Sequence, residues 1–231
     1  MNELKMDIKK LTIPLTEKDV RSLNIGDLIT LTGLIFTGTD VFHKRAVEEN
    51  ILPPIDYTKQ NVLVHAPMSI RRSKTAGWEP MQWHKLSFLT TAGARFDPYM
   101  PSLIKLLGLR AVISKSSMGE KTKRAMEAYG CVHLTQNSKL DRPGTTDSVR
   151  RVVDVYGFDE FGPFEATWVI EVQGWGPFIV DIDAHGNNLF DRIEQAAKEK
   201  MKTVWAHFGI PEDFRYAAGL PDSGEGTYYS R

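Results

Sequence analysis

Cysteine is almost absent from this chain of 231 residues, which contains Cys131 and no other. A single thiol cannot form a disulfide within the chain. It also cannot supply the several thiolates that an iron–sulfur cluster or a cysteine-rich zinc site requires. If the chemistry of this protein uses such a cluster, another polypeptide must hold it.

An excess of charge is also absent, because 29 Lys and Arg balance 29 Asp and Glu. This balance argues against binding to nucleic acid or to an anionic membrane, which usually requires a basic excess. No apolar run approaches the roughly 20 residues that span a bilayer. The first residues, "MNELKMDIKKLTIPL", lack the apolar core of a secretory signal. We therefore expect a cytoplasmic protein with neither nucleic acid nor membrane as a partner.

Several motifs for cofactors and metals are missing. No GxGxxG or GxxxxGK[ST] phosphate loop occurs, so nucleotide binding is not expected. The six histidines are scattered singly, without an HExxH pair. We predict no metal held by this chain alone.

The chain does contain a regular alternation of strand and helix patterns. Strands are predicted at "NVLVHAPM", "FLTT", "RAVIS" and "CVHLT", with helices at "PYMPSLIKLLG" and "MGEKTKRAMEAYG". Such alternation is typical of βαβ units, so part of the sheet should be parallel. We predict one α/β domain with a mixed sheet over residues 1–231, with a core at about 12–210 and a loosely held tail at 211–231.

Local signals predict further details. Thr16 can cap a short helix with Asp19 nearby, and a turn follows at Gly26-Asp27. Asp40 is placed to cap the helix in "VFHKRAVEEN".

The remaining segments are predicted from composition and turn residues. "TWVIEVQGWGPFIVDIDAHGNNLF" reads as a β-hairpin that ends in a Gly-Asn turn, and "SKLDRPGTTDSVRRVVDVYGFDEFGPFEA" as loop-rich. "RIEQAAKEKMKTVWAHFGI" reads as an amphipathic helix that closes the domain. "SIRRSKTAGWEPMQWHK" reads as a polar loop whose two tryptophans suit a lid or a contact surface.

A candidate anion site begins in "SFLTTAGARFDPYM", where Thr90 and Thr91 precede Arg95. Free backbone N–H groups at a strand-to-helix junction favour an anion, and an arginine fork can hold a carboxylate at two points. A hydroxyl there can relay a proton. A capping threonine beside a surface arginine would give the same pattern.

Lys115 ends the apolar strand of "AVISKSSMGEK". Ligands of open α/β sheets gather at the carboxyl ends of strands. Thr91 and Lys115 both end predicted strands joined by one helix, so we expect them to face the same crevice. A solvated lysine that starts a loop is the alternative.

"TGTDVFHKR" places Asp40 and His43 on the first turns of a helix. His43 can serve as an acid or base, because imidazole titrates near neutral pH. A helix cap and a packed histidine explain the same residues equally well.

Taken together, five phrases resemble the β subunit, or C-terminal domain, of class I fumarases and L-tartrate dehydratases, the iron–sulfur hydro-lyases. The similarity runs in register from about Ile13 to Phe190. The phrases are "IGDLITLTGLIFTGTDVFHKR", "VLVHAPM", "TTAGARFDPY", "VISKSSM" and "FGPFEATWVIEVQGWGPFIVDIDAHGNNLF".

The resemblance implies a swivelling β/β/α fold and a larger α subunit that carries a [4Fe-4S] cluster. The cluster's open iron acts as a Lewis acid on the substrate's hydroxyl and one carboxylate. A hetero-oligomer follows, with a homodimer of β-type chains as a further arrangement. The substrate would be a small 2-hydroxy (di)carboxylic acid that is reversibly dehydrated.

The resemblance also implies roles for the candidate residues. Thr91 assists proton transfer, and Arg95 and Lys115 hold the far carboxylate. The catalytic set also includes Asp40 and His43, which orient the site. The remaining substrate-binding positions are Thr90 and Thr39.

The chain departs from the family's motifs in ways that favour a substrate other than fumarate. The family's "ARD" reads Gly38-Thr39-Asp40, so a substrate-binding arginine is a threonine here. Losing that fork weakens dicarboxylate binding by roughly 1.5–3 kcal/mol. The family's "GKGG" reads Ser114-Lys115-Ser116-Ser117, and "HLTQNSKLDRPG" replaces a glycine–alanine run after Cys131. The alternative is a non-catalytic carboxylate-binding or scaffold subunit.

Overall fold

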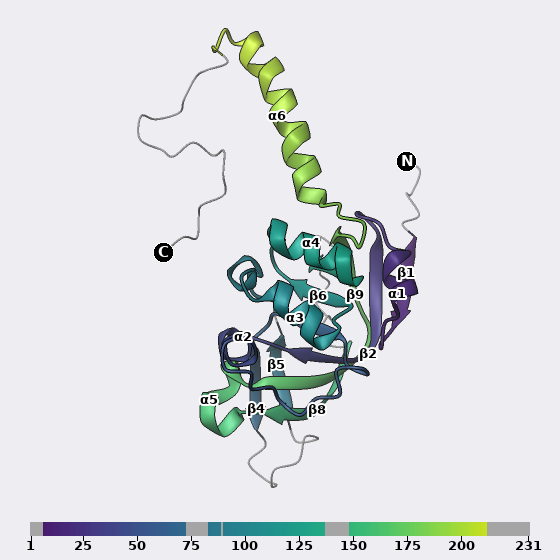
Figure 1. Ribbon diagram of the computed structural model, residues 1–231, viewed down its shortest axis with the longest axis vertical. Helices are drawn as coiled ribbons and strands as arrows, with labels where there is room; N and C mark the ends of the chain where they lie inside the picture. The colour runs from purple at the N-terminus through teal and green to yellow at the C-terminus, as the bar shows by residue number, and fades with distance from the viewer. Residues whose placement is uncertain (1–6, 73–82, 89, 137–147, 212–231) are drawn as a thin grey trace. The chain divides into compact units, whose positions relative to one another are not determined.

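The computed structural model describes residues 7–72, 83–88, 90–136 and 148–211. It divides into two compact units, Met1–Leu189 and Phe190–Arg231 (Figure 1). The first unit contains the sheets, and the second contains nearly all of the predicted amphipathic helix, α6 (Leu189–His207). A single domain over 1–231 stays a prediction, and the tail from residue 212 lies outside the described residues.

Five parallel strands confirm the mixed α/β fold predicted from the strand–helix alternation. They lie side by side in the order β1 (Ile8–Thr12), β2 (Leu28–Thr37), β3 (Val62–Val64), β6 (Ala111–Ser114), β7 (Val132–Gln136). Each pairs in parallel with the next. The carboxyl ends of these strands therefore meet at one edge of the sheet.

The sheet then curls on itself through one long strand, β9 (Thr167–Ile182), which is antiparallel to both β7 and β2. Strand β8 (Val149–Tyr156) pairs with the first part of β9, residues 167–172. The predicted hairpin is wrong, because residues 167–182 form one strand that does not reverse. Gly174 and Gly176 have φ of 61° and 131°, and the ladder with β2 shifts register at two places. Glycines with positive φ bend this strand without reversing it.

Strands β4 (Met68–Arg72) and β5 (Trp83–Phe88) form a separate antiparallel pair. The predicted strand "NVLVHAPM" is thus divided after Val64, and the ends of the predicted polar loop are strand instead. Residues 73–82, with Trp78, lie outside the described residues. Because β5 belongs to this second sheet, Thr91 does not end a strand of the main sheet as we expected.

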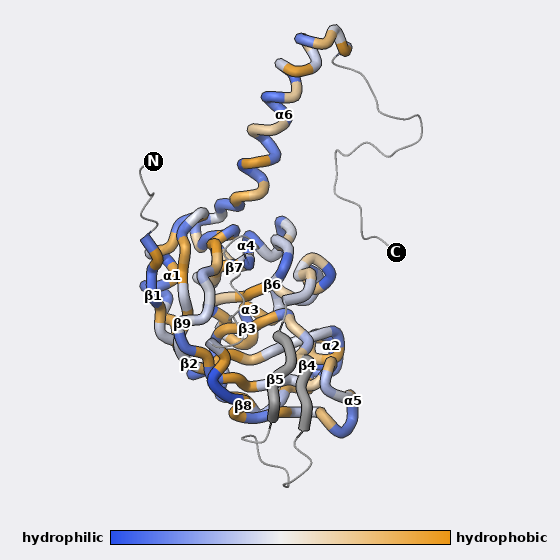
Figure 2. The backbone as a smooth tube through the Cα atoms, turned by 180° about the vertical axis from the view of Figure 1, so that it is seen from behind, coloured by the Kyte–Doolittle hydropathy of each residue, from blue (hydrophilic) through white to orange (hydrophobic). Residues whose placement is uncertain are grey.

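Three helices cover one face of the main sheet: α2 (Asp40–Val47), α3 (Met100–Leu107) and α4 (Glu120–Tyr129). Successive strand residues alternate between two buried clusters: Leu63 and Val112 pack with these helices, whereas their strand neighbours pack inside the curled sheet. Figure 2 shows the hydrophobic colouring along β3 and β6. The predicted loop before β9 is wrong for residues 149–165, which form β8 and helix α5 (Phe158–Glu165).

The helix starts match one of two predictions. Thr16 caps α1 (Glu17–Arg21) in a complete capping box with Asp19, as predicted. Asp40 is instead the first helical residue of α2, and Thr39 occupies the cap position. The carboxylate of Glu165 accepts the N–H of Val41 at 3.1 Å. Glu165, far away in sequence, thus makes the capping hydrogen bond that was expected of Asp40.

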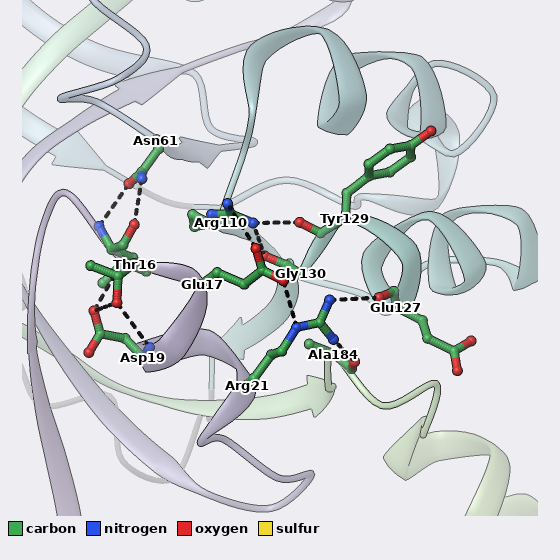
Figure 3. A network of polar contacts seen from close by, with 11 residues as sticks. Thr16, Glu17, Asp19, Arg21, Asn61, Arg110, Glu127, Tyr129, Gly130 and Ala184 are labelled. Carbon is green, nitrogen blue, oxygen red and sulfur yellow. Dashed lines mark hydrogen bonds and ion pairs between the residues drawn. The ribbon is translucent and has the colours of Figure 1, made fainter.

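At the opposite edge, a polar network joins the amino ends of β3 and β6 to α1 and α4 (Figure 3). Asn61 exchanges two hydrogen bonds with the backbone of Leu15. Arg110 donates to the carbonyl oxygens of Tyr129 and Gly130, where α4 ends. A cation that satisfies the last carbonyls of a helix also stabilises its dipole.

We therefore expect Arg110→Ala to lower the free energy of unfolding by about 1–3 kcal/mol, because it removes charged hydrogen bonds from a largely buried side chain. Urea unfolding measures this change. The control is Arg124→Ala, on α4 itself. The Arg124 side chain, which pairs with Glu120, is 77% exposed, so its loss should change stability by less than about 1 kcal/mol. Equal losses in the two variants would contradict the role given to Arg110.

Candidate functional site

The predicted site residues gather at the carboxyl edge of the parallel strands. Thr91 lies between the ends of β3 and β6, where its N–H donates to the carbonyl of His65 at 2.7 Å. Its own carbonyl accepts the N–H of Lys115 at 2.9 Å. The structure thus brings Thr91 and Lys115 together, although Thr91 arrives from the second sheet.

The Thr91 side chain is half-buried, and its hydroxyl makes no hydrogen bond to another described residue. The neighbouring hydroxyl of Thr90 instead donates to Gln136 Oε1 at the end of β7, at 3.0 Å. A clamped backbone with a free hydroxyl suits a group that must exchange a proton with a ligand.

The turns that carry Arg95 and Lys115 are joined by Ser116. Its Oγ accepts the N–H groups of Gly93 at 3.0 Å and Ala94 at 3.3 Å. A Cβ on Gly93 would clash with the Ser114 hydroxyl, so this close approach requires glycine.

Both cations of the site reach solvent. Lys115 is exposed, and it has no ion pair with another described residue. The Arg95 guanidinium is about half exposed and pairs with Asp40 at 3.1 Å. Asp40 therefore orients Arg95 while leaving other nitrogens of its fork available.

Thr39 is placed differently from the other candidates. It is buried, and its hydroxyl donates to Glu165 Oε2 at 2.8 Å. The position at which the resemblance implies a substrate-binding arginine is thus occupied by a side chain engaged inside the fold.

His43 is also fully buried, and its ring stacks on Phe96 with centroids 4.2 Å apart. Its Nδ1 lies 2.6 Å from the Thr39 carbonyl, and its Nε2 lies 3.1 Å from His65 Nε2. A carbonyl only accepts, so Nδ1 carries the proton and Nε2 accepts from His65. His65 Nδ1 is then a bare acceptor with no partner among the described residues.

The two rings are neutral for a clear physical reason. Burial lowers the pKa of His43 to about 4; the hydrogen bond to Thr39 opposes this change, and the positive charge of Arg95 adds to it. Burial, followed by the neighbouring His43, lowers the pKa of His65 well below its ordinary value. His43 thus lies as a neutral ring against Phe96, in the turn that carries Arg95.

This burial predicts acid sensitivity. The folded-state pKa of His43 lies below the ordinary 6.5, so the unfolded chain binds more protons between pH 6.5 and 4. The contribution of neutral His43 to the free energy of unfolding is fully present above pH 6.5. Up to about 3 kcal/mol of it is lost as the pH falls to 4. Urea unfolding at several pH values in this range gives the free energy of unfolding as a function of pH. Its slope should be flatter for His43→Asn than for the wild type. The control is His185→Asn, at an exposed histidine, which should keep the wild-type slope. An unchanged slope in both variants would contradict the assignment of the pH dependence to His43.

Sequence reasoning missed two residues that organise the site, His65 and Glu165. The only signal for His65 was a polar residue directly after an apolar strand in "VLVHAP". Glu165 carried no local signal, because it reaches Thr39 from 126 positions away.

The described residues do not fit an iron–sulfur cluster. Among residues 7–72, 83–88, 90–136 and 148–211, no three His, Cys, Asp or Glu side chains are grouped as metal ligands. Cys131 is buried, and burial raises the pKa of its thiol. None of the helices in these ranges is long and apolar enough to cross a membrane.

Known proteins place these features in context. The family described as Fumarase C-terminus matches residues 2–193. A putative L(+)-tartrate dehydratase subunit beta from Methanocaldococcus jannaschii is 32% identical over 82% of this chain and 95% of its own length. The L(+)-tartrate dehydratase subunit beta of Escherichia coli K12 is 30% identical over 85% and 93%.

A longer relative also matches. A putative fumarate hydratase class I from Geobacillus stearothermophilus is 32% identical over 83% of this chain. The match covers 35% of that protein, so this chain corresponds to about a third of it.

Proposed function

The chain belongs to the Fumarase C-terminus family, and on that basis we propose that it is the β-type subunit of a two-subunit hydro-lyase. The reaction would be the reversible dehydration of a small 2-hydroxy (di)carboxylic acid. In this arrangement the chain supplies half of the active site at the carboxyl edge of β2, β3, β6 and β7.

The observation that supports this proposal most strongly is the setting of Thr91. Its backbone is fixed between His65 and Lys115, whereas its hydroxyl has no partner among the described residues. Thr91 would exchange the proton at the carbon next to the leaving hydroxyl. A rigid backbone keeps this oxygen in place, which is the requirement for general acid–base catalysis.

The cations would hold the substrate. Arg95, oriented by Asp40, presents the rest of its fork to a carboxylate, and Lys115 adds a second positive charge. The carboxylate is already charged before the reaction, so most of this attraction would hold the substrate, and a smaller part would stabilise the negative charge that develops when the adjacent carbon loses its proton.

The iron–sulfur cluster would be held by the partner subunit, because the described residues of this chain lack a suitable ligand set. When bound there, the cluster supplies a Lewis acid for the substrate's hydroxyl. The α-type partner and the cytoplasmic location remain parts of the proposal.

Coexpression with a candidate partner that contains three well-separated cysteines tests this function. The complex, purified without oxygen, should dehydrate L-tartrate, L-malate or a related 2-hydroxy acid, and neither subunit alone should do so. Activity of this chain alone would refute the two-subunit proposal. Malate as the best substrate, turned over with full activity, would support the two-subunit function and refute the altered substrate.

One observation favours the alternative, a carboxylate-binding or scaffold subunit. Thr39, at the position of the family's arginine, is buried and bound to Glu165. A complex that forms but shows no turnover with any 2-hydroxy acid, and that keeps its carboxylate affinity, would support this alternative.

A further inference from the structure

A buried chain of three polar side chains lies directly behind the site. Asp181 Oδ1 lies 2.6 Å from His133 Nδ1, and His133 Nε2 lies 2.7 Å from Ser114 Oγ. All three side chains are completely buried. They cannot reach a substrate, so their function must be exerted through a neighbour.

The strand register explains how these three side chains come together. The ladder between β7 and β9 shifts between His133 and Leu134, which makes Asp181 the extra residue on β9. Such a bulge redirects a side chain, and here it lets the Asp181 carboxylate reach His133. Ser114 lies on the adjacent β6, diagonally opposite His133 on the same face of the sheet.

The hydrogen-bond directions among the three side chains follow from Ser114, the last of them. Ser114 Oγ lies 2.6 Å from the Ser116 carbonyl, which can only accept, so the Ser114 hydroxyl proton is used there. Ser114 must then accept from His133 Nε2–H. Asp181 Oδ2 has no hydrogen-bond partner in the described part of the chain, so the carboxylate depends on His133.

The series of three hydrogen-bonded side chains ends on the turn that carries Lys115. Ser114 holds the Ser116 carbonyl, and the Ser116 hydroxyl holds the N–H groups of Gly93 and Ala94, directly before Arg95. Ser114, Ser116 and His133 all lie where the sequence departs from the glycine-rich phrases that it otherwise resembles. The departures thus form one connected network.

We propose that Asp181, His133 and Ser114 form a positioning chain that fixes the turn at residues 114–116 and thereby places Lys115 in the carboxylate site. The proposal rests on the proposed function for its consequence in catalysis. The positioning itself is a property of this polypeptide without its partner. Because most of the attraction between Lys115 and the carboxylate would already be present before the reaction, the positioning chain should affect KM more than kcat.

A double-mutant cycle in the two-subunit complex tests the positioning. Ser114→Ala should raise KM for the 2-hydroxy acid that is turned over by about tenfold, with kcat within about twofold. In the Lys115→Met background, the same change should have less than about a twofold effect, because the positioned group is already gone. An equal KM effect in both backgrounds, or no effect in either, would overturn the proposal.

The matched control is Ser22→Ala, since Ser22 Oγ also donates to a backbone carbonyl at 2.6 Å but lies at the end of α1. A second pair of variants tests the buried end. Asp181→Asn keeps a hydrogen-bonding partner for His133 Nδ1 and should have nearly wild-type KM, whereas Asp181→Leu removes that partner and should resemble Ser114→Ala. Equal KM values for the two would count against the chain.

Hydrogen exchange on the full chain alone separates this inference from the proposed function. Ser114→Ala should speed exchange of the amides of Gly93, Ala94 and Lys115 at least about tenfold, and Ser22→Ala should not. Faster exchange, in a protein whose wild-type complex dehydrates no acid, would reject the function and retain the positioning. Unchanged exchange would reject the positioning whatever the activity.

Discussion

Replacement of Thr91 by valine should lower kcat of the two-subunit complex by about 10²–10⁴-fold, the usual contribution of a positioned acid–base group. Valine keeps the shape of threonine and loses only the hydroxyl. The backbone bonds of Thr91 to His65 and Lys115 do not involve the side chain, so the site should keep its geometry. Steady-state kinetics under anaerobic conditions measure the change, and KM should stay within a few-fold.

The matched control is Thr58→Val, in an exposed turn where the hydroxyl binds Asp56. That variant should keep wild-type kcat. If Thr91→Val keeps more than about a tenth of the wild-type kcat while the complex stays intact, Thr91 is not the proton-transfer group. The scaffold alternative would then gain support if Lys115 also proved dispensable.

Replacement of Lys115 by methionine should raise KM for a 2-hydroxy dicarboxylate by about 10- to 150-fold, which corresponds to about 1.5–3 kcal/mol for a charged hydrogen bond. Methionine keeps the length of the side chain and removes the ammonium. Lys115 is exposed and has no ion pair with the described residues, so its loss should leave stability nearly unchanged. Thermal unfolding and substrate titration of the complex measure the two effects.

Lys18→Met on the exposed surface of α1 is the control for removing one positive charge. It should reproduce any long-range electrostatic effect of Lys115→Met, which added salt would screen. If the two variants raise KM equally, Lys115 contributes only to the general charge of the protein and does not bind the carboxylate.

The sequence predicted the edge of the sheet better than the path of the chain toward it. Apolar runs that end at Val64 and Ser114 identified two parallel strands, because fully buried strands leave a clear local pattern. The path of β9 was not predictable in this way. Gly174 and Gly176 give the same local signal in a bent strand as in a hairpin, and only pairing with β2, far away in sequence, decides between them.

The same distinction applies to the site. The sequence predicted that Thr91 and Lys115 lie close together, and their backbones do make contact, although Thr91 does not end a strand of the main sheet. The link through Ser116 and the contact between Thr39 and Glu165 were not found, because each joins residues far apart in the chain. His43 was recognised by its residue type, but its burial against Phe96 depends on how α2 packs.

The central claim is that the turns at Arg95 and Lys115 form one carboxylate site for a substrate shared with a partner subunit. A crystal structure of the two-subunit complex with a bound 2-hydroxy dicarboxylate tests it most directly. The account predicts that the Arg95 guanidinium and the Lys115 ammonium both lie within about 2.7–3.2 Å of the same carboxylate, with the Thr91 hydroxyl next to the adjacent carbon. A ligand bound away from this edge, or the two cations directed to opposite sides of the molecule, would contradict it.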